Sequence, residues 1–334
     1  MTGTHTTSRQ LFPAPSIDQI PLLPGRWIAM AVAGSVVIDA ALLAGTGLRI
    51  DLNRVFAGFV VWAMAASTLC YIFRAPATRG ERIARDLIEG ISLFALISLL
   101  GAVASYPLAA GHHALVDPDL ERIDLSLHFH WTNWYTLIAG HKWLQAIERI
   151  AYLSIFVTPA LLIGYFAWAG RRAEARLFIA TFWVAALITL ILFPLFPAAG
   201  PFATLWHGSI PYMPLSGLYQ DQVILALRHH SIRLVDLGAL HGLVCAPSFH
   251  AASAVIYIVT ARTIAPLRWP ITALNIVMLL ATPVEGTHYL ADVLGGMMVA
   301  CLALWLMPAL IKVTAPRTIG WAADFEREMP VVAG

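Results

Sequence analysis

The amino-acid sequence predicts an all-α polytopic integral membrane protein, a bundle of about eight transmembrane helices. Its 334 residues are 59% hydrophobic and only 12% charged, and the mean hydropathy is +0.74. Soluble domains usually carry about a quarter charged residues. Several apolar runs approach the roughly 20 residues that a helix needs to cross the bilayer core. These observations exclude the pair of soluble domains that the length alone would allow.

Eight apolar runs, taken in chain order, predict the helices of the bundle. The first follows a polar, proline-marked stretch, residues 1–24, that does not resemble a cleavable signal. Two long segments, 109–149 and 194–246, remain between the runs. The predicted spans cover about residues 27–47, 54–73, 86–108, 150–168, 175–193, 247–264, 270–285 and 287–309.

Positive charge gathers in alternate loops, which predicts the orientation of the chain. "RAPATRGERIAR" (74–85) and "RRAEAR" (171–176) are rich in arginine, Arg262 and Arg268 flank a later turn, and Lys312 follows the last span. Cytoplasmic loops carry an excess of Lys and Arg. We therefore expect these loops and both termini in the cytoplasm, and the two long segments on the outer side of what we infer to be a bacterial inner membrane.

The two outer segments differ from ordinary linkers. Trp131, Trp134 and Trp143 recur at helical spacings among charged residues, which is typical of helices that lie in the membrane interface. "FPLFPAAGPF" (193–202) holds three prolines and must break the helix before it. The three cysteines fit no disulfide or metal pattern, and the net charge of +2 indicates no nucleic-acid partner.

"CAPSFHAASAV" (245–255) and "EGTHYLADVLGG" (285–296) carry the candidate site. Proline favours the first turn of a helix and serine can cap its free amides, so we expect a helix to start at Pro247 and Ser248, with His250 in its first turn. A hairpin of two spans then returns the chain to the same face. There His288 is expected in the first turn of the last helix, close to His250.

Asp292 follows His288 by four residues, which places both side chains on one helical face. A carboxylate at this depth is costly unless it has a partner, and the imidazole is the nearest one. Such a carboxylate fixes the tautomer of the imidazole and leaves its other nitrogen nucleophilic. A protonated His250 could deliver a proton to a leaving alkoxide, and two facing helix N-termini could bind an anion. The pattern favours phosphoryl transfer on a lipid head group.

Two other interpretations remain open from these residues. "HFH" (128–130) with His141, His229, His230 or His241 could bind a metal, although the spacings match no familiar zinc pattern. Asp292 and the histidines could instead relay protons in a non-catalytic transporter. Transporter folds tend to show inverted repeats, and no internal repeat is visible in this sequence.

The two motifs resemble those of the type-2 phosphatidic-acid phosphatase superfamily, in which a "PSGH"-like motif opens one helix and a His-x-x-x-Asp motif opens another. "APSFHAA" and "THYLADVLGG" match in order and spacing, and the resemblance covers about residues 150–309. It implies a six-helix core and a phosphohistidine mechanism without metal or other cofactor. It also implies that His288 attacks phosphorus, Asp292 orients it, His250 protonates the leaving group and Ser248 helps to bind phosphate.

The sequence departs from this family pattern at two places. The arginine expected six residues before the nucleophile is Thr282, and "FPLFPAAGPF" has no basic residue where a Lys…Arg-Pro motif is expected. These features resemble the inositol-phosphorylceramide and sphingomyelin synthase branch, which moves a phospho-head group between lipids. A simple phosphatase of phosphatidate or polyprenyl phosphate is the alternative. The phosphate contacts are then expected from other basic residues, namely Arg228, Arg233, His230, Lys142 and Arg149.

These inferences divide the chain into three parts. Residues 1–149 are expected to form N-terminal transmembrane helices and an outer interfacial segment, 150–312 the catalytic core, and 313–334 a cytoplasmic tail. The expected partners are a lipid phosphate and an acceptor, which is water or a second lipid.

Overall fold

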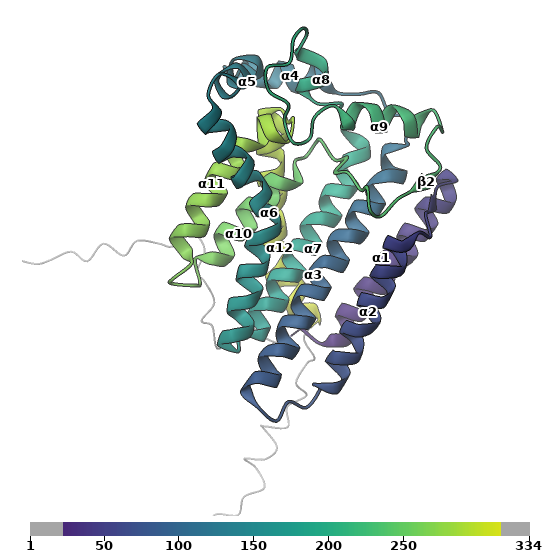
Figure 1. Cartoon of the computed structure of the whole chain (residues 1–334), viewed down its shortest axis with the longest axis vertical. Coiled ribbons are helices and arrows are strands. Elements are labelled where there is room, and N and C mark those ends of the chain that lie inside the picture. The colour runs from purple at the N-terminus through teal and green to yellow at the C-terminus, as the bar shows by residue number, and fades with distance from the viewer. Residues whose placement is uncertain (1–22, 315–334) are drawn as a thin grey trace, which may run out of the picture.

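The computed structural model describes residues 23–314, so almost all of the predicted tail lies outside the described residues. All eight predicted spans are helices, which confirms the all-α membrane bundle (Figure 1). They are α1 (Gly25–Thr46), α2 (Arg54–Ile72), α3 (Arg79–Ala109), α6 (Lys142–Ala169), α7 (Arg172–Leu192), α10 (Phe249–Ala261), α11 (Arg268–Glu285) and α12 (Leu290–Thr314).

Six of these helices are long and apolar enough to cross a membrane, and α10 and α11 are not among them. α10 has 13 residues and α11 has 18. A helix rises about 1.5 Å per residue, so α10 alone is shorter than the hydrocarbon core of a bilayer. The hairpin of α10 and α11 therefore contains the shortest of these eight helices, α10, and it packs against the long helices α6, α7 and α12.

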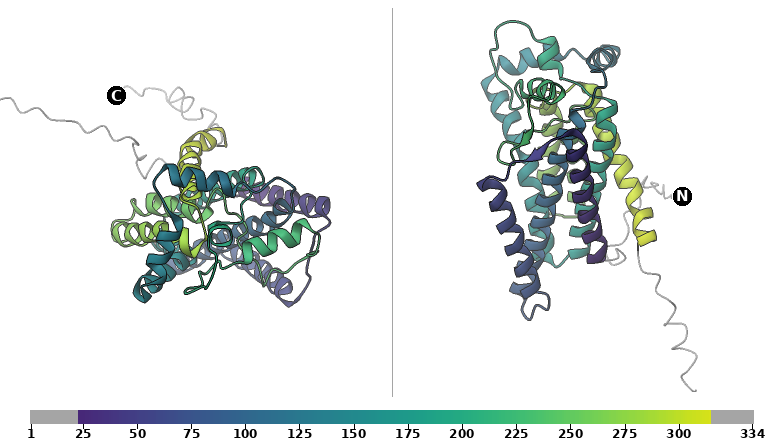
Figure 2. Two further views of the ribbon diagram at one scale, coloured as in Figure 1. Left: turned by 90° about the horizontal axis from the view of Figure 1, so that it is seen from above. Right: turned by 90° about the vertical axis from the view of Figure 1, so that its right-hand side faces the viewer.

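The two long segments between the spans fold over one end of the bundle, which we call the capped end (Figures 1 and 2). The short helices of the capped end are α4 (Asp117–Ser126), α5 (Trp131–Ala139), the 3-10 helix η2 (Phe193–Leu195), α8 (Pro201–Leu205) and α9 (Tyr219–Arg228). A two-residue parallel pair, β1 (Arg49–Ile50) with β2 (Leu234–Val235), ties the α1–α2 connection to the segment before α10.

The core of the bundle lies between α6, α7, α10, α11 and α12. Phe178 and Phe182 on α7 pack against Tyr257 on α10, and all three side chains are buried. α2 contrasts with these helices, because Ala66 is its one buried residue. Its remaining apolar surface is what a helix presents to lipid tails rather than to protein.

A close contact between α12 and the start of α10 sets the position of the site. A Cβ on Gly296 would lie 2.0 Å from the carbonyl oxygen of Ser248, which no rearrangement of a side chain could relieve. The amide of Ser248 also donates to the carbonyl of Asp292 at 3.0 Å. The glycine therefore lets the first turn of α10 lie directly on α12.

The predicted interfacial tryptophans have another role in the structure. Trp131 is buried and its indole donates to the carbonyl of Pro283 at 2.7 Å, while Trp134 donates to the carbonyl of Leu280 at 3.3 Å. The last carbonyls of a helix have no partner within it, so α5 supplies donors to the C-terminal turn of α11. Trp143 alone of the three is largely exposed, at 61%.

Candidate active site at the capped end

The hairpin of α10 and α11 brings His250, His288 and Asp292 to the capped end, as the sequence predicts. His250 lies in the first turn of α10, whose N-cap Ser248 accepts a hydrogen bond from the amide of Ala251. The expectation that His288 lies in the first turn of α12 is wrong, because the helix begins at Leu290. Thr287 before it adopts a left-handed conformation with φ of 53°, so the chain turns sharply there.

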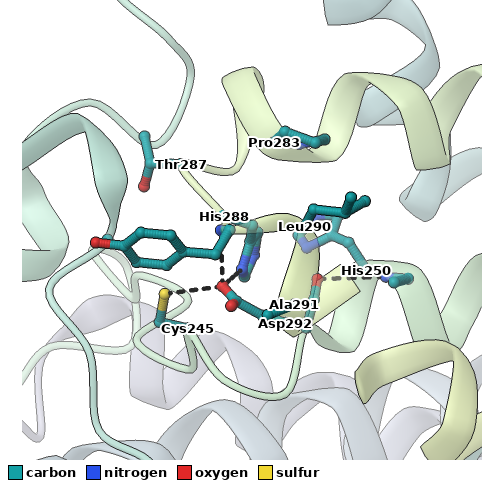
Figure 3. A network of polar contacts seen from close by, with 12 residues as sticks. Cys245, His250, Pro283, Thr287, His288, Leu290, Ala291 and Asp292 are labelled. Carbon is teal, nitrogen blue, oxygen red and sulfur yellow. Dashed lines mark hydrogen bonds and ion pairs between the residues drawn. The ribbon is translucent and has the colours of Figure 1, made fainter. Parts of the chain in front are cut away.

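Asp292 is the centre of the site's polar contacts (Figure 3). Its Oδ2 accepts from Nδ1 of His288 at 3.1 Å, from the amide of Tyr289 at 3.0 Å and from the thiol of Cys245 at 3.3 Å. Asp292 and His288 are 1% and 3% exposed. Because a carboxylate only accepts, we assign the proton of His288 to Nδ1, which leaves Nε2 as a nucleophilic nitrogen.

Cys245 was not predicted as part of the site, although it stands in the quoted motif. Its side chain is buried, and burial together with the nearby Asp292 carboxylate raises the pKa of the thiol well above its ordinary value. The thiol therefore stays protonated and acts as a donor. Cysteine at the edge of an apolar run resembles an ordinary core residue, and only the fold shows its contact with Asp292.

Carboxylates already occupy the N-terminal amides of α12. Asp124 on α4 accepts hydrogen bonds from the amides of Leu290 and Ala291 at 2.9 and 2.8 Å. Asp292 accepts one from the amide of Tyr289, the residue before them. The prediction that this N-terminus offers amides to a substrate anion is therefore wrong. The first amides of α10, those of Phe249 and His250, have no acceptor within their helix and are the ones left for an anion.

Burial raises the pKa of Asp124 to about 6, while the two amide hydrogen bonds oppose that shift. The nearby Asp292 carboxylate adds to the rise. Asp124 therefore titrates close to neutrality although it caps a helix.

The segment "FPLFPAAGPF" supports the site with its backbone. The amides of Ala199 and Gly200 donate to Asp117 at 2.9 Å each, and Asp117 also accepts from the hydroxyl of Tyr289. Gly200 has a positive φ of 94°, and a Cβ there would lie 2.7 Å from the carbonyl oxygen of Thr287. The segment thus packs directly against the residue before His288.

Tyr152 on α6 stacks its ring on the imidazole of His250. The two rings are stacked, with centroids 4.0 Å apart and an angle of 11° between their planes. The hydroxyl lies 3.3 Å from Nδ1 of His250, but nearly parallel rings place it above the imidazole instead of in its plane. The contact is therefore a stack and not an in-plane hydrogen bond. Nothing in the sequence distinguishes Tyr152 from other interfacial tyrosines.

Gly286 brings Tyr152 and His288 together. A Cβ on Gly286 would lie 2.6 Å from Cδ2 of His288 and 2.9 Å from the hydroxyl of Tyr152. Both side chains therefore approach the same point of the backbone. His250 stacks on the same tyrosine, so the two histidines share one site around Tyr152.

A loop over the site, residues 206–218, is held by Glu285 at the end of α11. The Glu285 carboxylate accepts from the hydroxyl of Tyr212 and, at 2.9 Å, from the amide of Leu215. Its carbonyl accepts from the amide of Ser216, whose hydroxyl lies 3.5 Å from that of Tyr152. The loop therefore reaches the Tyr152–His250 pair.

Of the basic residues expected near the phosphate, the structure brings Arg149 to this loop. Arg149 lies on α6, three residues before Tyr152, and donates to the carbonyl of Met213 at 3.2 Å. Lys142 begins α6 and is exposed. Arg228 and His230 lie at and just after the end of α9.

Arg233 lies beside the two-stranded pair, where its carbonyl accepts from the amide of Arg49. Its backbone thus belongs to the connection with α1 and α2, and no contact joins its side chain to the histidines in the described part of the chain.

Among residues 23–314, one group has the ligand atoms for a metal ion, and it is Cys245, His288 and Asp292. The histidines of "HFH" are not gathered with His141, His229, His230 or His241 into such a group, so that metal interpretation is not supported. Nδ1 of His288 and Sγ of Cys245 lie 3.1 and 3.3 Å from Oδ2 of Asp292. These separations fit hydrogen bonds, and the contacts already account for the arrangement.

Comparison with known families agrees with the motifs. The profile of the PAP2 superfamily matches residues 118–306, which is more than half of the 334 residues. The chain belongs to the PAP2 superfamily. The matched range begins in α4 and ends in α12, so it contains His250, His288 and Asp292. As a PAP2 superfamily member it is a membrane-embedded, phosphatase-type enzyme of lipid phosphates. No curated protein and no solved structure matches it.

Proposed function

We propose that the protein cleaves or transfers a phosphate ester on a lipid through a phosphohistidine on His288. The observation that carries this proposal is the buried contact of 3.1 Å between Asp292 and Nδ1 of His288. Asp292 fixes the proton on Nδ1 and stabilises the positive charge that develops on the ring when Nε2 bonds to phosphorus.

The first half of the reaction forms the phosphoenzyme. Nε2 of His288 attacks phosphorus, and the bond from phosphorus to the ester oxygen of the leaving group breaks. The leaving alkoxide takes a proton from the imidazolium of His250. The amides of the first turn of α10 and the hydroxyl of Ser248 would hold the phosphate oxygens, with Arg149 as the first basic candidate and Arg228, Arg233, His230 and Lys142 as further ones.

The second half regenerates the enzyme. His250, now neutral, takes a proton from the acceptor hydroxyl, whose oxygen bonds to phosphorus while the bond to Nε2 breaks. Water as acceptor gives hydrolysis, and a lipid hydroxyl gives transfer. The absence of basic residues from residues 193–202 favours the inositol-phosphorylceramide and sphingomyelin synthase branch, and with it transfer.

We also propose that the site faces the outer side of a bacterial inner membrane. Arg79, Arg82, Arg85, Arg171 and Arg172 all lie at the starts of α3 and α7 or in the turns before them, at the end opposite the capped end (Figure 1). An excess of arginine is typical of cytoplasmic loops.

The experiment is an incubation of the detergent-purified protein with labelled phospholipids, with and without ceramide or diacylglycerol. Free head-group phosphate identifies a phosphatase, and a new labelled lipid that needs the acceptor identifies a transferase. We expect His288→Ala to abolish either product while expression and membrane insertion persist. Unchanged turnover by this variant would reject the nucleophile.

A chelator arm of the same experiment tests the metal interpretation of Cys245, His288 and Asp292. We expect EDTA and 1,10-phenanthroline to leave turnover unchanged, because the proposed chemistry needs only protein groups. Loss of turnover that zinc restores would assign these three residues to a metal instead.

A further inference from the structure

We propose that Tyr152 is a positioning residue that holds His250 as an imidazolium by presenting the face of its ring to it. This role rests on the proposed function, in which His250 must be protonated before the leaving group departs. Tyr152 would not touch the reacting atoms and would act through His250 alone.

The geometry of the pair carries the inference. Centroids 4.0 Å apart with planes 11° from parallel place the imidazole over the electron-rich face of the phenol ring. Cations within about 6 Å of an aromatic centroid are attracted by the ring quadrupole, and most strongly where water is excluded. Tyr152 is 8% exposed and His250 is partly buried, so water is excluded from the tyrosine side of the stack.

His250 needs this support because its other neighbours do little to stabilise a positive charge on its imidazole. The in-plane edges of its imidazole have no carboxylate partner in the described residues, whereas His288 has Asp292. Burial and the nearby His288 both disfavour a charged imidazole. The ionisable groups beside His250 are Tyr152 on α6 and His288 in the segment before α12. Tyr219 on α9, Glu285 at the end of α11 and Cys245 in the segment before α10 lie around Tyr152, and Asp292 on α12 contacts His288.

The stack also explains how the pair keeps its position. Tyr152 lies against the point where a side chain on Gly286 would collide with it, and Ser216 of the 206–218 loop approaches its hydroxyl at 3.5 Å. The ring therefore lies between the loop, the segment before His288 and α10. It can set the plane of the His250 ring relative to the phosphate without forming a bond to either nitrogen.

The test is a series of residues of one shape at position 152, introduced by amber suppression: phenylalanine, 4-fluorophenylalanine and 3,4,5-trifluorophenylalanine. Fluorination weakens the ring quadrupole while it preserves packing, so folding is retained. The protonation midpoint of His250 is measured by NMR on histidine-labelled protein in detergent, with its signal assigned by its loss in His250→Gln. This readout needs no turnover, and it therefore separates failure of this inference from failure of the proposed function.

We expect Tyr152→Phe to keep the midpoint within about 0.3 pH units of that of the native protein, because the ring remains. Fluorination should then lower the midpoint stepwise by a total of roughly one pH unit, the size of a desolvated cation–π contact. The alkaline limb of the kcat profile should move to lower pH by the same amount. The same fluorinated series at Tyr257, which lies on α10 away from His250, serves as the matched control and should move neither.

Three results would overturn the inference. One is a midpoint that does not respond to fluorination. Another is a midpoint that drops fully with Tyr152→Phe, which would assign the effect to the hydroxyl. The third is a His250 signal that stays neutral down to pH 4 in the native protein.

Discussion

At the residue scale, one carboxylate oxygen of Asp292 accepts hydrogen bonds from two parts of the segment before α12. Its Oδ2 accepts a hydrogen bond from Nδ1 of His288, which orients the ring. The same oxygen accepts a hydrogen bond from the amide of Tyr289, the residue before α12. His288 therefore keeps its contact with Asp292 although it lies outside the helix. The proposed nucleophile is thereby attached to a rigid helix through the side chain of Asp292 instead of through the helical backbone.

Asp292→Asn tests the orienting role. An amide can present N–H to Nδ1 and so favour the other tautomer, with the proton on Nε2. We expect kcat to fall about 10³- to 10⁴-fold, as seen when a triad carboxylate becomes an amide, while the melting temperature changes little. A kcat within tenfold of the native value would show that the carboxylate does not set the tautomer.

Cys245 offers a smaller test of the same oxygen. Cys245→Ala removes one donor to Asp292, and Cys245→Ser retains one. From a net contribution of about 1–1.5 kcal/mol per hydrogen bond, we expect the alanine variant to lose roughly tenfold in kcat and the serine variant clearly less. Equal kcat values for the two variants would mean that the thiol contributes only volume.

At the element scale, the site depends on how closely α10 approaches α12. Gly296 permits the contact with Ser248, and Asp124 fixes the start of α12 from α4. Both features act on helix ends that carry a proposed catalytic group. The alignment of the two histidines therefore depends on elements far apart in the sequence.

Gly296→Ala should push the start of α10 away from α12 and move His250. Because its Cβ would lie 2.0 Å from a backbone oxygen, we expect a loss of at least about 2 kcal/mol of stability and more than a tenfold loss of kcat. Gly164→Ala on α6 is the matched control, since nothing lies within 4 Å of its added Cβ. Thermal unfolding in detergent and kcat measure both, and equal behaviour of the two variants would refute the close-contact argument.

Asp124 predicts how stability depends on pH. Its pKa is about 6 in the fold and near 3.8 in the unfolded chain, so the protonated form is favoured by folding. Its contribution is fully present below about pH 4 and is lost as pH rises through about 6. The melting temperature of the native protein minus that of Asp124→Asn should fall between pH 4 and pH 6.5. A difference that grows over this range would contradict the assignment.

At the scale of the whole molecule, the bundle separates ion pairs that join helices from the proposed catalytic groups. At the end opposite the capped end, Glu89 on α3 accepts from Arg172 and Arg176 on α7, and Asp86 pairs with Arg85. The pairs of Glu89 with the two arginines join α3 to α7 at this end. The histidines lie at the capped end, so the two regions can be changed independently.

Glu89→Gln should therefore lower stability without touching catalysis. Arg172 and Arg176, whose side chains are 27% and 10% exposed, would lose their ion pairs with Glu89. We therefore expect the free energy of unfolding to fall by about 2–3 kcal/mol. The kcat should be unchanged at a temperature where the variant is folded. Asp119→Asn breaks an ion pair that is 76% and 63% exposed and should cost less than about 1 kcal/mol. A large fall in kcat for Glu89→Gln would mean that the two ends are coupled.

The sequence predicted the parts of this structure that depend on local composition. Long apolar runs identified the helices, and the motifs around His250 and His288 predicted two histidines that the fold brings to one end of the bundle. The start of α12 was predicted three residues too early, because Asp124 caps the amides of Leu290 and Ala291 through a tertiary contact. Tyr152 and Cys245 were missed for the same reason, since a stack and a thiol donor exist only after folding. Trp131 was assigned to the interface because an indole that caps α11 has the same spacing as one that faces lipid.

The most direct test of the central claim is the capture of phosphate on His288. A lipid phosphate ester with a nitrophenyl leaving group needs no general acid, so His250→Ala should still form the phosphoenzyme but break it down slowly. We predict that mass spectrometry after a short incubation at neutral pH finds phosphate on His288 in this variant, and none in His250→Ala combined with His288→Ala. Turnover of the ester with no phosphate on His288, or phosphate on another residue, would contradict the account.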